Sequence, residues 1–61
     1  MNNTYQDLHI YNWKTKDTWV IRQIKIKEIK FTETEIFIDF IKDTMQSRIE
    51  LTKEYVEITI D

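Results

Sequence analysis

Residues 24–41 read IKIKEIKFTETEIFIDFI, and this stretch decides the fold. Isoleucines alternate with charged residues at its start, and a second apolar run follows the polar segment 32–35. Alternation with a period of two is typical of a β-strand that buries one face. The polar segment between the runs has turn-forming composition. We therefore predict two antiparallel strands joined by a four-residue turn, Thr32–Glu35.

A break in the alternation predicts a bend in the first of these strands. Ile24 and Ile26 have even numbers. Ile29 and Phe31 have odd numbers, so a regular strand would place them on the opposite face. A β-bulge adds one residue to a strand and restores a common face. We therefore place a bulge at Lys27-Glu28.

Two further turns extend the sheet with the same apolar face. A two-residue turn at Asp43-Thr44 places Ile36 opposite Leu51. A four-residue turn at Thr52–Tyr55 then places Leu51 opposite Val56. Because separate turns agree on one face, we predict strands in meander order. The apolar face, which is also the expected core or dimer face, consists of Ile29, Phe31, Ile36, Ile38, Phe40, Ile49, Leu51, Val56 and Ile58.

A hairpin is expected before this sheet. Leu8 and Ile10 alternate with polar residues in a strand predicted over Gln6–Trp13. The polar segment Lys14–Asp17 is typical of a turn, and the long bent strand follows over Thr18–Phe31. The expected fold is all-β, with a single antiparallel sheet of four to five strands.

A helix over residues 47–55 is the alternative for the later part of the chain. Ser47 and Glu50 match a capping box, and Ile49, Lys53 and Val56 have helical spacing. Alternation with a period of two describes the apolar residues of this region better, so a strand is favoured. The spacing alone leaves the helix open.

Composition limits how such a sheet is stabilised. The chain has 61 residues, so we expect a single small β domain over residues 1–61, with Met1–Thr4 disordered. A chain of this length buries only about 60% of the surface of its unfolded state. Cysteine is absent, which excludes disulfides and thiolate metal sites. Self-association is the remaining source of stability, and a homodimer is therefore expected.

The apolar face needs a cover. The bent strand would allow the sheet to close into a small barrel over its own core. Alternatively, two copies would pack as a dimeric sandwich. The opposite face is also partly apolar, which favours the homodimer because a small monomer seldom exposes so much apolar surface. The residues expected on that face are Val20, Phe37, Ile41 and Tyr55.

Aromatic and basic side chains gather in the first hairpin. If this hairpin pairs Trp13 with Trp19, an aromatic platform lies beside two lysines. Packing at the end of a small core or a dimer contact is the favoured interpretation. Binding of a protein partner comes second, and stacking of nucleic-acid bases third. The candidate partner-binding residues are Tyr11, Trp13, Lys14, Lys16 and Trp19.

No set of residues predicts a chemistry. His9 has Asp7 nearby but no nucleophile, so we expect no enzyme. The acidic residues around the second turn match no ion-binding loop, and neither a metal nor a cofactor is expected. The net charge of −2 argues against a generic nucleic-acid binder. No apolar run is long enough to span a membrane, and the lack of cysteine fits a cytoplasmic location.

In overall character the chain resembles small phage-encoded proteins that inhibit host defence systems. The resemblance lies in a single Ile-, Lys- and Glu-rich, cysteine-free domain of minimal length, without a specific motif. It implies a homodimeric inhibitor that binds and blocks a protein in the host cytoplasm. The expected function is therefore that of a small protein–protein interaction module. The alternative is a nucleic-acid-binding small β-barrel that uses Trp13, Trp19 and the nearby lysines.

Overall fold

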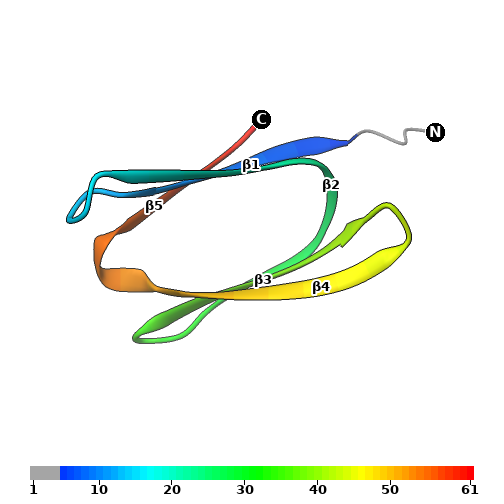
Figure 1. Ribbon diagram of the computed structural model, residues 1–61. Coiled ribbons are helices and arrows are strands. Elements are labelled where there is room, and N and C mark those ends of the chain that lie inside the picture. The colour runs from blue at the N-terminus through cyan, green and yellow to red at the C-terminus, as the bar shows by residue number, and fades with distance from the viewer. Residues whose placement is uncertain (1–4) are drawn as a thin grey trace.

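The computed structural model describes residues 5–61, which form a five-stranded antiparallel sheet (Figure 1). The segment Met1–Thr4, expected to be disordered, lies outside the described residues. Along the sheet the strands follow the order β4-β3-β2-β1-β5. The elements are β1 (Gln6–Asn12), β2 (Asp17–Phe31), β3 (Glu35–Lys42), β4 (Met45–Thr52), the short 3-10 helix η1 (Lys53–Tyr55) and β5 (Val56–Ile60).

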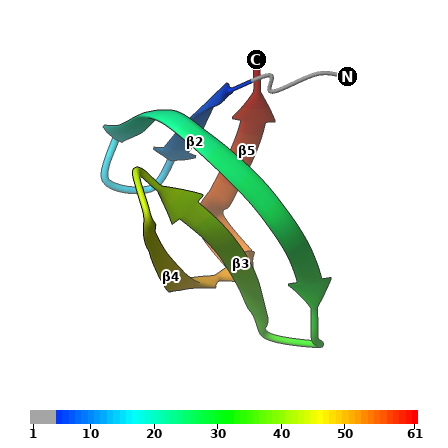
Figure 2. The same ribbon diagram turned by 90° about the vertical axis from the view of Figure 1, so that its right-hand side faces the viewer.

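The sheet folds over on itself because β2 is long and bent. The first half of β2 pairs with β1, and its second half pairs with β3. The strand therefore crosses from one layer of the structure to the other, as its long arc in Figure 2 shows. The bulge predicted at Lys27-Glu28 is confirmed, since the register with β3 shifts between Ile26 and Glu28.

An unpredicted second bend lies at Arg22-Gln23. The register between β1 and β2 shifts between Gln6 and Leu8, so that β2 has one residue more than β1 at this point. Gln23 has a φ of 58°. That left-handed conformation costs an L-amino acid roughly 1–2 kcal/mol, so neighbouring groups must stabilise it.

The registers among β2, β3 and β4 confirm the predicted pairing. Phe31 lies opposite Ile36, and Ile36 lies opposite Leu51. Asp43-Thr44 joins β3 to β4 as the predicted two-residue turn, and Asp43 has a φ of 58°. These three strands thus share the apolar face that their alternation indicates.

The predicted place of the last strand beside β4 is wrong. β5 pairs with β1, with Val56 opposite Asn12 and Ile58 opposite Ile10. Residues 53–55 form one turn of 3-10 helix instead of a hairpin turn, and they carry the chain away from β4. The helical alternative over residues 47–55 is reduced to this turn, because β4 continues to Thr52. Among the described strands β4 and β5 are not paired, so the sheet is not closed into a barrel.

The core lies between the two layers of the folded sheet. The first hairpin contributes two of its buried side chains, and the segment of β2 between the bends contributes another. The predicted apolar face supplies the rest, although Phe31 at the end of that face is 64% exposed. The buried residues are Leu8, Ile10, Ile24, Ile36, Ile38 and Phe40. Ile29, Ile49, Leu51, Val56 and Ile58 are partly buried against them.

Candidate functional site

The turn between β1 and β2 is held by Asn12. Its side-chain Oδ1 accepts hydrogen bonds from the backbone N–H groups of Lys14 and Thr15, both at 3.0 Å. Its carbonyl oxygen accepts a third from the backbone N–H of Lys16 at 2.6 Å. An asparagine side chain often holds a turn in this way, so the hairpin tip is fixed without glycine or proline.

Trp13 does not pair with Trp19, so the condition for a platform of two paired tryptophans is not met. Trp13 belongs to the turn, whereas Trp19 lies in β2 opposite Ile10. The ring of Trp13 instead packs edge to face on Tyr55, with ring centroids 5.3 Å apart and an interplanar angle of 79°. The backbone N–H of Trp13 also donates to the carbonyl oxygen of Tyr55 at 3.0 Å. The contact was missed because Tyr55 lies far away in the sequence.

The tip of the hairpin and η1 lie together at one end of the molecule, which we call the aromatic end (Figure 1). The Nζ atom of Lys14 lies 4.5 Å from the centroid of the Tyr55 ring, a cation–π contact. Trp13 and Trp19 remain 47% and 51% exposed. The fifth predicted binding residue, Tyr11, lies apart in β1, half buried and opposite Glu57. The aromatic end consists of Trp13, Lys14, Lys16, Trp19 and Tyr55.

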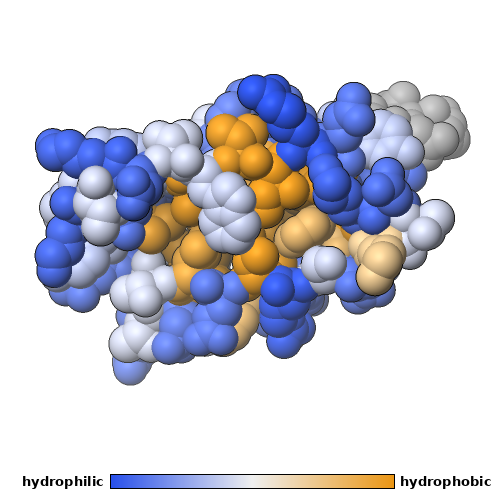
Figure 3. Space-filling model, in the orientation of Figure 1, coloured by the Kyte–Doolittle hydropathy of each residue, from blue (hydrophilic) through white to orange (hydrophobic). Residues whose placement is uncertain are grey.

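A second surface is an open apolar groove along β5, with a volume of about 460 Å³. Figure 3 shows apolar side chains reaching the surface between the two layers of the sheet. Phe31 and Ile60 are 64% and 37% exposed, so this chain covers its own apolar face incompletely. The groove is lined by Ile29, Phe31, Ile36, Lys53, Val56, Ile58 and Ile60.

Lys53 closes one end of the groove. Its Nζ donates a hydrogen bond to the carbonyl oxygen of Thr32 at 3.2 Å and lies 5.9 Å from the centroid of the Phe31 ring. Its backbone N–H donates to the carbonyl oxygen of Thr34 at 2.8 Å. These contacts fix η1 against the turn between β2 and β3. A neighbouring hollow of about 520 Å³ is lined by residues of that turn, Thr52 and η1, all of them polar.

The register between β1 and β5 shows which residues of β5 direct their backbone N–H and C=O groups toward the free edge of the sheet. Asp7 and Asp61 exchange two backbone hydrogen bonds, with N···O distances of 3.2 and 3.0 Å. Hydrogen-bonded pairs alternate along an antiparallel ladder, so Glu57 and Thr59 also direct their N–H and C=O groups toward β1. The even-numbered residues of β5 therefore direct theirs toward the free edge. These are Val56, Ile58 and Ile60.

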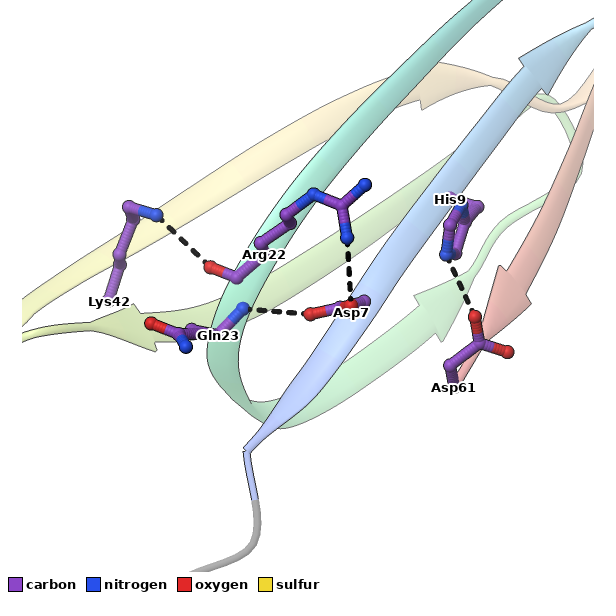
Figure 4. A network of polar contacts seen from close by, with 6 residues as sticks. All are labelled: Asp7, His9, Arg22, Gln23, Lys42 and Asp61. Carbon is purple, nitrogen blue, oxygen red and sulfur yellow. Dashed lines mark hydrogen bonds and ion pairs between the residues drawn. The ribbon is translucent and has the colours of Figure 1, made fainter.

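Polar contacts stabilise the first bend of β2 (Figure 4). The Asp7 carboxylate accepts hydrogen bonds from the backbone N–H of Gln23 at 3.0 Å and from Nη1 of Arg22 at 3.3 Å. The Nζ of Lys42 donates to the carbonyl oxygen of Arg22 at 3.1 Å. The backbone N–H of Gln23 and the C=O of Arg22 are thus engaged by side chains from the strands on either side, which stabilises the positive φ of Gln23.

His9 lies near a carboxylate but in no catalytic arrangement. Its Nε2 lies 2.9 Å from Oδ2 of Asp61. His9 lies between β2 and β5 in the sheet, opposite Val20 and Thr59. The neighbours of His9 are therefore the Asp61 carboxylate and the two adjacent strands.

The ion pair beside the second bend links β3 to β4. Nε and Nη2 of Arg48 donate to the two carboxylate oxygens of Asp39, at 2.6 and 3.1 Å. This hydrogen-bonded pairing holds the pKa of Asp39 below its usual value and raises the pKa of Arg48. The guanidinium group of Arg48 also lies 5.7 Å from the centroid of the Phe37 ring.

Within residues 5–61, no group of three or more histidine and acidic side chains is placed to hold a metal ion. The described chain also has no helix of the length and apolar character needed to cross a membrane. No protein-family model, curated protein or solved structure matches this chain.

Proposed function

We propose that the protein is a protein–protein interaction module that binds its partner through the aromatic end and acts by contact. The observation that carries this proposal is the half exposure of both tryptophans, 47% for Trp13 and 51% for Trp19. Tryptophan is among the residue types most enriched in the hot spots of protein interfaces. Trp13 is already fixed on Tyr55, so it loses little conformational freedom when a partner covers it.

Two lysines give the aromatic end a positive rim. Lys14 is held over the Tyr55 ring at 4.5 Å, and Lys16 is exposed in the same turn. Opposite charges across an interface speed association and select the partner. We therefore expect a partner surface with an apolar pocket for a tryptophan ring and carboxylates around it.

The resemblance to small phage inhibitors supplies the class of partner, a bacterial defence protein. In this proposal the module occludes a working surface of that protein and contributes no catalytic group. The rigid hairpin suits this role, because Asn12 fixes the turn before binding.

Affinity capture from a bacterial lysate with three matched baits tests the proposal. The baits are the wild type, Trp19→Ala and Met45→Ala. Met45 is 69% exposed and begins β4 at the opposite end of the molecule (Figure 1). We expect a protein that the wild type and Met45→Ala retain and Trp19→Ala loses. If no protein shows this pattern, the aromatic end is not the binding surface.

Titration with a fluorescent single-stranded oligonucleotide distinguishes the alternative function. A base-stacking platform of paired tryptophans has no support in the register, which puts Trp19 opposite Ile10. We expect no binding at low salt. Salt-sensitive binding that Trp19→Ala and Lys16→Glu both weaken would assign the aromatic end to nucleic acid instead.

A further inference from the structure

We propose that two copies of the chain associate by antiparallel pairing of their β5 strands, with a two-fold axis at Ile58. The occupant of the groove is then a second copy of this chain. This interface uses residues outside the aromatic end, so it goes beyond the proposed function and does not depend on it. It also gives a geometry to the homodimer expected from composition.

The backbone of β5 is complementary to itself about Ile58. Val56, Ile58 and Ile60 direct their N–H and C=O groups toward the free edge, as the exchanged bonds between Asp7 and Asp61 imply. A two-fold axis at Ile58 pairs Ile58 with its own copy and Val56 with Ile60. Ile58 and Ile60 have free N–H and C=O groups, and Val56 has a free C=O, while the N–H of Val56 closes the 3-10 turn of η1. About four hydrogen bonds therefore join the two strands. A one-residue shift would instead oppose groups already bonded to β1.

The apolar side chains agree with the same register. Val56, Ile58 and Ile60 line the groove with Ile29 and Phe31. In the paired strands the residues opposite these three are again Val56, Ile58 and Ile60, so the apolar row continues across the axis. The second copy's strand then lies along the groove and removes Phe31 and Ile60 from water, which exposed apolar surface favours.

Charge selects this register over its neighbours. With the axis at Ile58, Glu57 lies opposite Thr59 on the outer face. An axis at Glu57 would oppose two Glu57 carboxylates, and an axis at Thr59 would oppose Glu57 with Asp61. Like charges directly opposite each other destabilise a pair of strands, so the acidic residues disfavour both shifted arrangements.

The other free edge is less suited to pairing. β4 carries Arg48 and Glu50, both exposed. Charged side chains along an edge strand discourage addition of another strand. β5 is short, and its charged residues lie at Glu57 and past its end at Asp61.

Light scattering from micromolar to sub-millimolar concentration tests the association. The wild type is expected to reach about twice the chain mass of 7.6 kDa. Ile60→Pro removes an N–H that faces the free edge and leaves the bonds to β1 intact, so it is expected to stay monomeric and folded. Ile60→Val keeps the N–H and is expected to dimerise. A wild type that stays monomeric, or an Ile60→Pro chain that dimerises equally well, overturns the proposal.

Single cysteines in this cysteine-free chain test the register. Glu57 of one copy lies opposite Thr59 of the other in a non-hydrogen-bonded pair, with Cα atoms about 4.5 Å apart, within the range that disulfides span. Glu57→Cys and Thr59→Cys chains mixed in equal amounts are expected to form the mixed disulfide severalfold faster than either forms its own. Equal rates rule out the axis at Ile58, and a mass above that of a dimer rules out closed pairing of β5. Trp19→Ala is expected to leave these rates unchanged, which separates this interface from the aromatic end.

Discussion

Both bends of β2 help to fold the sheet over on itself, but different interactions stabilise them. At Arg22-Gln23 the backbone takes a positive φ, and Asp7 and Lys42 hold it with side-chain contacts to its N–H and C=O groups. At Lys27-Glu28 the described residues show no positive φ, and the ladder resumes at once with Glu28 opposite Asp39. The first bend therefore depends on specific polar partners. The second depends on apolar pairing to either side.

The largest expected loss of stability comes from a substitution in the part of β2 between the two bends. Ile24 lies between them and is fully buried, at 0% exposure. Ile24→Ala is expected to lower the free energy of unfolding by about 2–5 kcal/mol, because a buried methyl-rich side chain leaves a cavity. Urea unfolding measures this. Met45→Ala, at an exposed site, is the control and is expected to stay within about 0.5 kcal/mol of the wild type. If Ile24→Ala and Met45→Ala lowered the free energy of unfolding equally, burial of Ile24 would not stabilise the bent strand.

The next effect separates the two bends. Asp7→Ala removes the acceptor for the Gln23 N–H and the Arg22 guanidinium. It is expected to cost about 1–2 kcal/mol, the lower part of the range for hydrogen bonds to charged groups, since the site is partly exposed. Asp7→Asn keeps an acceptor oxygen and is expected to recover at least half of the loss. An Asp7→Ala chain as stable as the wild type would show that the first bend needs no polar partner.

A substitution to glycine is expected to change the free energy of unfolding in opposite directions at the two bends. Gln23→Gly relieves the positive φ at a small cost in unfolded-state entropy, for a net gain of about 0.5–1 kcal/mol. Lys27→Gly has no such strain to relieve and is expected to lose about 0.5–1 kcal/mol. Thermal unfolding of the two variants side by side measures the difference. The same sign at both sites would remove the distinction between the bends.

The smallest expected effect is the loss at low pH of the stability that the Asp39–Arg48 ion pair contributes. The pKa of Asp39 is lowered in the folded state by its hydrogen bonds to Arg48, below an unfolded value of about 3.9. Its contribution to stability is therefore present above that value and is lost as the pH falls through the folded pKa. Asp39→Asn is expected to unfold at lower urea than the wild type near neutral pH, and this gap should close as the pH falls through the lowered pKa of Asp39 in the folded state. A gap that stays constant would exclude the ion pair as its cause.

The sequence predicts the part of the fold that short turns determine. Alternation assigned Phe31, Ile36 and Leu51 to one face, and turns of two and four residues then left one register for β2, β3 and β4. The bend at Lys27-Glu28 was visible because isoleucines on both sides change parity. The bend at Arg22-Gln23 was not recognised, although Val20 and Ile24 have the same parity and were expected on opposite faces. That conflict itself requires an extra residue between them, which the register with β1 shows.

Alternation cannot say which strand lies beside which. Val56 and Ile58 have the spacing of a strand next to β4, yet they pair with β1, because η1 redirects the chain. The contact between Trp13 and Tyr55 follows from this same long-range pairing. The aromatic end therefore contains four of the five predicted binding residues, and its central packing partner was not among them.

The pairing of β5 with β1 also sets an order of events during folding. The hairpins formed by β1–β2, β2–β3 and β3–β4 each close over a few residues, on the microsecond scale of isolated hairpins. β5 must find a strand at the other end of the sequence, with Asp61 meeting Asp7, and contacts of high sequence separation form more slowly. A newly made chain therefore carries Val56–Ile60 as an undocked strand for longer than any other. If two such chains meet at that stage, each strand can dock on the other's β1, and a domain-swapped dimer results.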